Sequence, residues 1–281
     1  MSFKDIEIVD CFRDAIQGLH QPIATQKKID YVNLLLASGR FSCLDIGSFV
    51  SPKAVPQMAD TADVLAGIVK SGSTKLSVVV ANERGAEAAL AQEKVDFLGY
   101  PFSISETFQK RNTNADLKES FERVQRMQNR VAASDKELIV YISMAFGNPY
   151  EDAWDKQMVV YWLDQLKSIG VARFSLADTT GEATPDSITA VLQEVAAYDP
   201  SLNPSLHLHS RLDSALSKID AAYRAGCRKF EGAILGYGGC PFAQDNLVGN
   251  IPTELLLLHF EESSTEELQP IITAFKDLIA D

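Results

Sequence analysis

Residues 205–225 read SLHLHSRLDSALSKIDAAYRA and contain the unit from which the chain is built. Residues 205–209 alternate polar and apolar side chains, which is typical of a β-strand with two different faces. Residues 213–225 carry apolar side chains at the three- and four-residue spacing of an amphipathic helix. A short strand followed by a helix is the βα unit of a parallel sheet.

The same alternation recurs along the 281 residues. Strands are expected at residues 6–11, 43–46, 76–80, 97–102, 138–144, 174–176, 205–209 and 230–233. Helices are expected at residues 26–38, 61–71, 85–92, 117–133, 154–168, 185–197, 213–225, 253–259 and 265–279. Eight such units favour a (β/α)₈ TIM barrel, with the last helix as an addition.

We therefore expect a single catalytic domain over residues 1–281. An open, doubly wound sheet is the alternative, and no glycine-rich phosphate fingerprint follows the first strand. The net charge of −12 argues against nucleic acid, because binding phosphates requires a basic face. A small anionic substrate stays compatible with it, since a few buried cations dominate locally.

The beginning of the chain shows no apolar segment of a signal peptide, and no apolar run approaches the roughly 18 residues of a membrane span. The four cysteines show no C-x-x-C spacing. We expect a cytoplasmic protein with free thiols and no contact with a membrane.

In such a barrel the chemistry lies at the carboxyl ends of the strands. The first strand runs into Arg13 and Asp14, and the second contains Asp45 within an apolar run. A buried unpaired carboxylate is costly, so Asp45 needs a partner, and Arg13 on the adjacent strand is the obvious one. Taken alone, an Arg–Asp pair is more often a local ion pair or a helix cap.

His207 and His209 are two of the four histidines and end the seventh strand. Their two-residue spacing points both into the barrel mouth, where they could hold a divalent metal. Asp14 is the nearest strand-end carboxylate, and Asn250 could add an amide oxygen. Two imidazoles with oxygen ligands suit Mg²⁺ or Mn²⁺.

A glycine-rich segment around Cys240 follows the eighth strand. Its glycines allow positive φ, so it could fold over the site and present the thiol as a proton donor. A plain loop with an incidental cysteine is equally compatible. Tyr141 and Asp178 lie near other strand ends and are expected to line the mouth, although Asp178 also fits a simple turn.

Together these segments resemble the 3-hydroxy-3-methylglutaryl-CoA lyases of the metal-dependent TIM-barrel lyases and synthases. The matching pieces are RDxxQ at 13–17, SFVSPKxVPQM at 48–58, SLxDTxG at 175–181, HxH at 207–209, GGCPFAQ at 238–244 and GN at 249–250. The first and fourth pieces are shared across the superfamily, whereas SFVSPK and GGCP are specific to the lyases.

The resemblance implies a metal site of Asp14, His207, His209 and Asn250. It implies that Arg13 stabilises the enolate of departing acetyl-CoA and that Cys240 protonates the carbanion, while Asp45 stands where the family usually has Glu. The expected substrate-binding residues are Arg13, Gln17, Ser48, Tyr141, Ser175 and Thr179.

The implied reaction is metal-dependent cleavage of 3-hydroxy-3-methylglutaryl-CoA, an acyl-CoA, to acetyl-CoA and acetoacetate, by a homodimer. Either Asp14 or Asp45 could take the hydroxyl proton. The alternatives are an acetyl-CoA-condensing synthase of the same superfamily and a catalytically silent barrel that binds an acyl-CoA or a partner protein. Departures such as Phe12 for Pro and Asn148 for Cys remove no expected ligand.

Overall fold

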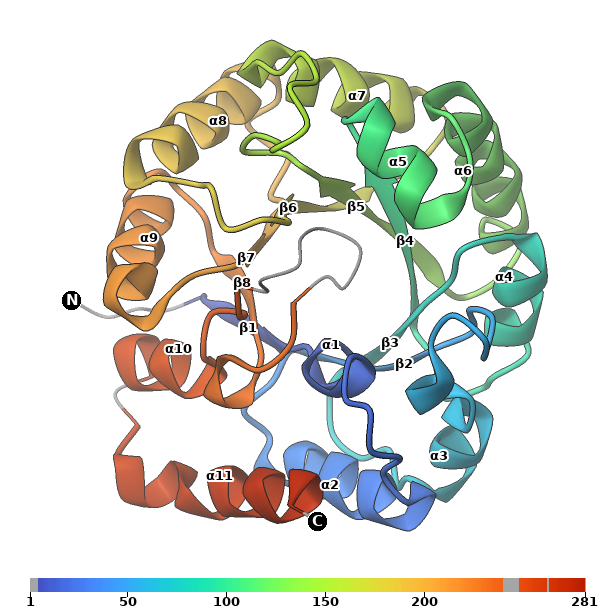
Figure 1. The fold of residues 1–281 in the computed structure, drawn as a ribbon, viewed down its shortest axis with the longest axis vertical. Helices are drawn as coiled ribbons and strands as arrows, with labels where there is room; N and C mark the ends of the chain where they lie inside the picture. The colour runs from blue at the N-terminus through green and yellow to red at the C-terminus, as the bar shows by residue number, and fades with distance from the viewer. Residues whose placement is uncertain (1–4, 240–247, 262, 281) are drawn as a thin grey trace.

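The computed structural model describes residues 5–239, 248–261 and 263–280. Its strands form one closed barrel in the order β1-β2-β3-β4-β5-β6-β7-β8, and all neighbours are parallel. The strands are β1 (Glu7–Asp10), β2 (Cys43–Ser48), β3 (Lys75–Val79), β4 (Phe97–Ser103), β5 (Glu137–Ser143), β6 (Arg173–Asp178), β7 (Ser205–Leu208) and β8 (Lys229–Gly232). The predicted (β/α)₈ barrel is confirmed, and Figure 1 shows the ring of helices around it.

Helices connect the strands on the outside of the barrel. Their bounds are α1 (Phe12–Gln17), α2 (Thr25–Ser38), α3 (Thr61–Gly67), α4 (Glu83–Leu90), α5 (Glu106–Thr113), α6 (Leu117–Val131), α7 (Lys156–Ser168), α8 (Pro185–Tyr198), α9 (Leu212–Arg224), α10 (Thr253–Phe260) and α11 (Thr265–Ile279). Short 3-10 turns are η1 (Pro56–Met58) and η2 (Ile234–Gly236).

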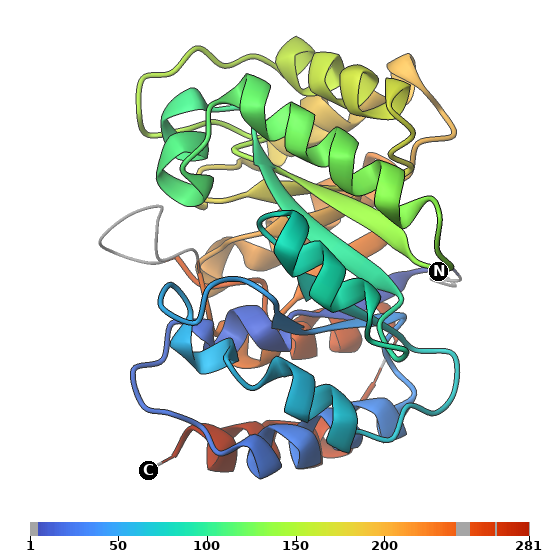
Figure 2. The same ribbon diagram turned by 90° about the vertical axis from the view of Figure 1, so that its right-hand side faces the viewer.

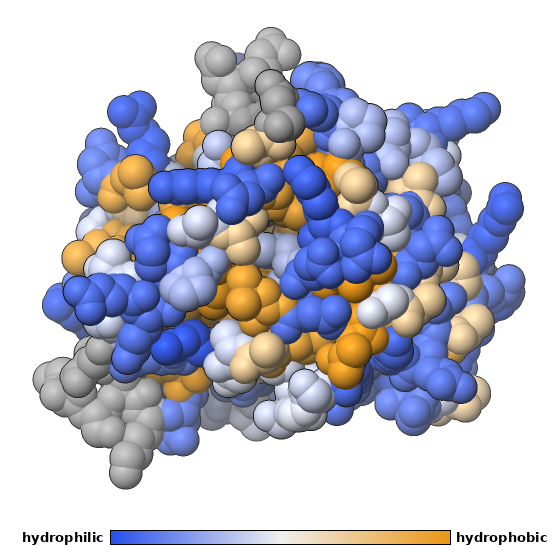
Figure 3. Space-filling model, turned by 90° about the horizontal axis from the view of Figure 1, so that it is seen from below, coloured by the Kyte–Doolittle hydropathy of each residue, from blue (hydrophilic) through white to orange (hydrophobic). Residues whose placement is uncertain are grey.

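The expected additional helix at the end of the chain is α11. It packs along α2, and the rings of Tyr31 and Phe275 meet there at 5.6 Å. Figure 2 shows the two helices side by side below the barrel. Figure 3 shows the molecule from that side, where hydrophilic side chains predominate and apolar ones emerge between them.

Two helices were not predicted. Helix α1 has only six residues and follows β1 directly, so it has no periodicity of its own to detect. Helix α5 reads ETFQKRNT, which is polar, and it depends on the Ser105 hydroxyl that accepts a hydrogen bond from the Phe108 amide. Both lie at the carboxyl ends of strands, and both contribute residues to the pocket described below.

The strands are covered on both faces, which explains their apolar composition. Leu206 and Leu208 of β7 are buried in the core between the barrel and its helices, whereas His207 and His209 face the mouth. The predicted orientation of this strand is therefore confirmed. In the described residues no helix is both long enough and apolar enough to cross a membrane.

Candidate active site

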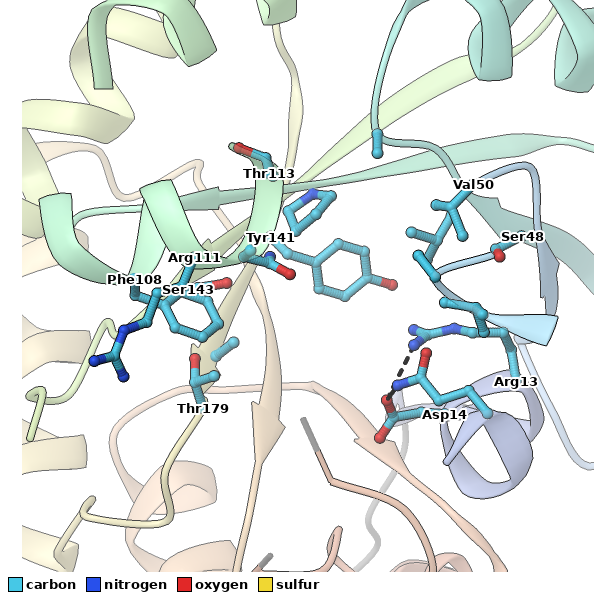
Figure 4. Close-up of a pocket in the computed structure, with 18 of the residues that line it drawn as sticks. Arg13, Asp14, Ser48, Val50, Phe108, Arg111, Thr113, Tyr141, Ser143 and Thr179 are labelled. Atoms are coloured by element: carbon cyan, nitrogen blue, oxygen red, sulfur yellow. Dashed lines mark hydrogen bonds and ion pairs between the residues drawn. The ribbon is translucent and has the colours of Figure 1, made fainter. Parts of the chain in front are cut away.

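A pocket of about 470 Å³ opens at the carboxyl ends of the strands. Arg13 and Asp14 lie on one side of it, and Phe108 and Thr179 lie on the other. The ring of Tyr141 lies between these two sides (Figure 4). The pocket therefore has one wall near β1 and β7 that carries the paired charges (the charged wall), and a second wall near β4 and α5 that combines Phe108 with the polar and cationic side chains of Arg111 and Thr113 (Figure 4).

The charged wall contains the predicted metal-ligand group. Asp14, His207 and His209 each offer one ligand atom, and these atoms all lie within 4.8 Å of one another. The two imidazole Nε2 atoms are 3.2 Å apart. Adjacent ligands of an octahedral ion with bonds of roughly 2.1 Å would be about 3 Å apart. The donor set and its spacing fit a divalent ion such as Mg²⁺ or Mn²⁺.

Asn250 lies beside this group because its backbone forms an isolated antiparallel β-bridge with that of His209. Its Nδ2 donates to Asp14 Oδ2 at 2.6 Å and to the Tyr237 carbonyl at 2.8 Å. The structure thus places Asn250 beside the predicted ligands, with the amide nitrogen toward the carboxylate. Ligation by its amide oxygen stays a prediction.

Buried charges set the protonation states of this wall. Burial raises the pKa of Asp14, but Arg13 and the two histidines outweigh it and lower the pKa to about 2. Burial and the neighbouring His207 lower the pKa of His209 to about 4. An ionised carboxylate and a neutral imidazole are the forms in which these side chains bind metals.

Arg13 is held by two carboxylates. It donates from Nε and Nη2 to Asp45 Oδ2 at 2.9 and 2.5 Å, and from Nη1 to Asp14 Oδ1 at 3.0 Å. The predicted pairing of Arg13 with Asp45 is confirmed. Burial raises the pKa of Asp45 although Arg13 opposes it. Arg13 lines the pocket, whereas Asp45 lies beneath it as support.

The structure places four of the other predicted residues in the pocket wall: Gln17, Ser48, Tyr141 and Thr179. Gln17 Nε2 donates to Asp14 Oδ1 at 2.6 Å. The buried Ser48 hydroxyl has no hydrogen-bond partner among the described residues, so it is available to a ligand. Burial and nearby carboxylates raise the pKa of Tyr141, whose phenol is therefore neutral.

Ser175, Asp178 and Cys240 are the exceptions. Asp178 is 2% exposed, pairs with Lys218 and does not line the pocket. Ser175 is fully buried, does not line the pocket, and donates its hydroxyl to Glu231 Oε1 at 2.7 Å. It therefore lies one layer below the surface that a substrate would touch. Cys240 lies outside the described residues, and its predicted role stays a prediction.

Three features of the site were missed from the sequence. Glu231 in β8 hydrogen-bonds His207, and Lys218 in α9 pairs with Asp178 at 3.0 Å. Helix α5 contributes Phe108, Arg111, Asn112 and Thr113 to the pocket wall. A glutamate within a short apolar strand was the available signal for Glu231, as it was for Asp45. Nothing in the local pattern indicates the other two.

Comparison with known proteins gives a consistent result. The family model described as HMGL-like matches residues 5–274. The chain is 32% identical over 270 residues to hydroxymethylglutaryl-CoA lyase YngG of Bacillus subtilis, covering 94% of this chain and 88% of that protein. It is 34% identical over 245 residues to a 3-hydroxy-3-isohexenylglutaryl-CoA/hydroxy-methylglutaryl-CoA lyase of Pseudomonas aeruginosa, covering 87% and 81%.

Among solved structures, an HMG-CoA lyase of Acinetobacter baumannii in complex with coenzyme A and 3-methylmalate superposes with a TM-score of 0.91 and 29% identity. The match covers 99% of this chain and 93% of that one. The family model spans nearly the whole barrel and includes every element that builds the pocket. The chain belongs to the HMGL-like family.

Proposed function

We propose that this protein is a hydroxymethylglutaryl-CoA lyase that cleaves 3-hydroxy-3-methylglutaryl-CoA to acetyl-CoA and acetoacetate. The observation that carries the proposal is the convergence of Asp14, His207 and His209 beside Arg13 in the barrel mouth. Relatives that carry this name support it, and they align over most of the chain.

Asp14, His207, His209 and the amide oxygen of Asn250 would hold Mg²⁺ or Mn²⁺. Such an ion, when bound, supplies a Lewis acid that makes the substrate hydroxyl more acidic. Asp14 is poorly suited to accept the hydroxyl proton itself, because its pKa of about 2 makes it a weak base. Its role is to bind the ion. Its Oδ1 also accepts hydrogen bonds from Arg13 and Gln17 and so fixes these two side chains.

Arg13 supplies the positive charge that the cleavage step needs. Cleavage leaves an enolate of the thioester, and a fixed guanidinium at the pocket wall stabilises the negative oxygen. Asp45 accepts two hydrogen bonds from Arg13 and so fixes the direction of the guanidinium. We therefore assign Asp45 the task of orienting Arg13 from below the pocket wall. Its Oδ1 has no hydrogen-bond partner among the described residues and burial raises its pKa, so Asp45 also takes the hydroxyl proton that Asp14 accepts poorly.

The other residues position the substrate and complete the proton transfers. Ser48 offers a hydroxyl, Thr179 lies on the side of the pocket opposite Arg13 and Asp14, and the ring of Tyr141 lies between the two sides (Figure 4). Cys240 returns a proton to the carbanion carbon of the leaving acetyl group. Replacement by alanine should then lower the rate of cleavage, and full activity of C240A would remove the thiol from the scheme.

The decisive experiment is product analysis. Purified protein is incubated with 3-hydroxy-3-methylglutaryl-CoA and Mg²⁺, Mn²⁺ or EDTA, and acetoacetate and acetyl-CoA are quantified. We expect both products in equal amounts with metal and neither with EDTA. Absence of acetoacetate with every metal would overturn the proposal. Thiol release from acetyl-CoA with 2-keto acids instead would favour the condensing synthase.

Binding of Mn²⁺ measured by calorimetry separates a working metal centre from a catalytically silent barrel. The proposal also includes an acyl-CoA as the substrate, one catalytic domain over the whole chain, and a homodimer as the assembly. The cytoplasmic location stays a prediction.

A further inference from the structure

Glu231 occupies the centre of the barrel, one layer below the candidate metal centre. It is 3% exposed and lies in β8. Its Oε1 accepts hydrogen bonds from the hydroxyls of Ser175 and Ser205 at 2.7 and 2.5 Å. Its Oε2 lies 3.0 Å from Nδ1 of His207 and 3.7 Å from the thiol of Cys11. Side chains from β6, β7 and the junction of β1 with α1 thus converge on one carboxylate.

This arrangement defines which nitrogen of His207 carries the proton. A carboxylate surrounded by hydroxyl donors is an acceptor on both oxygens. The group that faces it on the imidazole is therefore Nδ1–H, and in the neutral ring, the form that binds a metal, this leaves the lone pair on Nε2. Nε2 is the atom 3.2 Å from Nε2 of His209, on the side where the ligand group with Asp14 gathers.

We propose that Glu231 is a positioning residue of the metal centre, which holds His207 in the tautomer and orientation that present Nε2 to a divalent ion. The inference rests on the proposed function and adds to it a residue that does not touch the substrate. A carboxylate behind a histidine ligand raises the basicity of the ligand and restricts its ring orientation.

The same geometry assigns Ser175 and Ser205 a supporting task. Both donate to Oε1 and so leave Oε2 directed at His207. Ser175 then acts through Glu231 and needs no contact with the acyl group. These two roles predict different measurements: loss of an acyl contact would raise KM, whereas loss of support for Glu231 would weaken metal binding.

The test uses the metal-free full-length protein and the variant E231Q. Nitrogen-15 NMR of the histidine rings should show His207 as the Nδ1–H tautomer in the wild type. The glutamine amide offers a donor as well as an acceptor, so E231Q should show a mixture or the Nε2–H form. The dissociation constant for Mn²⁺ should rise by about 10- to 100-fold.

Glu137→Gln is the matched control, because it removes the same charge from an exposed glutamate at the other end of the barrel. E137Q should bind Mn²⁺ within twofold of wild type. S175A, which keeps the carboxylate, should weaken Mn²⁺ binding severalfold and thus tests the idea even if E231Q does not fold. Unchanged Mn²⁺ affinity in a folded E231Q, or in S175A, would overturn the inference.

Both readouts are independent of catalysis. If the variants bind Mn²⁺ more weakly but the wild type has no lyase activity, the positioning role of Glu231 stands and the proposed function fails. If the wild type is an active lyase but the variants bind Mn²⁺ as tightly as it does, the proposed function stands and the positioning role fails.

Discussion

The two ends of the barrel interior carry the same types of charged residue in very different surroundings. At the amino ends of the strands, Arg173 pairs with Glu137 at 2.8 Å, with side chains 38% and 49% exposed. At the carboxyl ends, Lys218 pairs with Asp178 at 3.0 Å, with side chains 5% and 2% exposed. Solvated pairs contribute little to stability, whereas buried pairs require full desolvation of both charges.

Cavity size does not distinguish the two ends. The cavity at the amino ends is about 530 Å³, and the mouth pocket is about 470 Å³. The difference lies in how charges are held: at the mouth, Arg13, Asp14 and Asp45 are locked together beside two buried histidines. Burying these charges costs desolvation free energy, and clusters of this kind are concentrated at functional sites. The carboxyl ends of the strands are therefore the functional end of this barrel.

The largest expected effect comes from removing charge at the mouth. D14N should lower metal-dependent cleavage by at least about 1000-fold, because it removes a ligand charge and one anchor of Arg13. Steady-state kinetics with saturating Mn²⁺ measures this. E137Q at the opposite end should keep its rate within about twofold. A comparable loss of cleavage rate in D14N and E137Q would contradict the conclusion that only the carboxyl ends of the strands are functional.

Breaking the buried pair should have the next largest effect. Lys218 Nζ contacts Asp178, the His209 carbonyl at 2.7 Å and the Gly181 carbonyl at 3.2 Å. K218M should lower the free energy of unfolding by about 3 kcal/mol or more, because it leaves a buried carboxylate without its cation. Denaturant unfolding measures this, and the double variant K218M/D178N should recover part of the loss.

A third prediction concerns pH. Burial raises the pKa of Asp10 to about 7, although the Thr253 hydroxyl at 2.7 Å opposes the shift. The folded state then binds an extra proton above pH 4, so this group makes the protein less stable as pH rises toward 7. D10N should remove that dependence and be more stable than wild type at pH 8, by on the order of 2 kcal/mol.

Thermal unfolding of D10N and wild type across this pH range provides the measurement. The two proteins should differ least at about pH 4 and below, where Asp10 is protonated in both the folded and the unfolded state. A wild type that gains stability relative to D10N as pH rises would show that the Asp10 carboxylate is stabilised in the fold.

The smallest effect is expected at the amino ends. R173M removes an exposed pair with Glu137 and should change the free energy of unfolding by less than about 1 kcal/mol. Denaturant unfolding at low and high salt measures it, and the difference from wild type should shrink as salt increases. A loss as large as that of K218M would mean that exposure does not separate the two ends.

Much of the site could be predicted because its signals are local. Each expected strand is present, and Arg13, Asp14, His207 and His209 meet at one pocket. The side of the pocket that α5 forms could not be predicted, because an eight-residue polar helix has no apolar periodicity that distinguishes it from a loop. Ser175 is at the expected strand but below the pocket, because its height in the barrel depends on register between strands.

By itself, the sequence determined the alternation of strands and helices and the common face of His207 and His209, because both follow from periodicities of two and about 3.6 residues. Only the tertiary structure decided that Glu231 lies behind His207, since β7 and β8 meet in a register that local pattern does not encode. It also decided the pKa values of Asp10 and Asp14, because burial and neighbouring charges arise when the barrel closes.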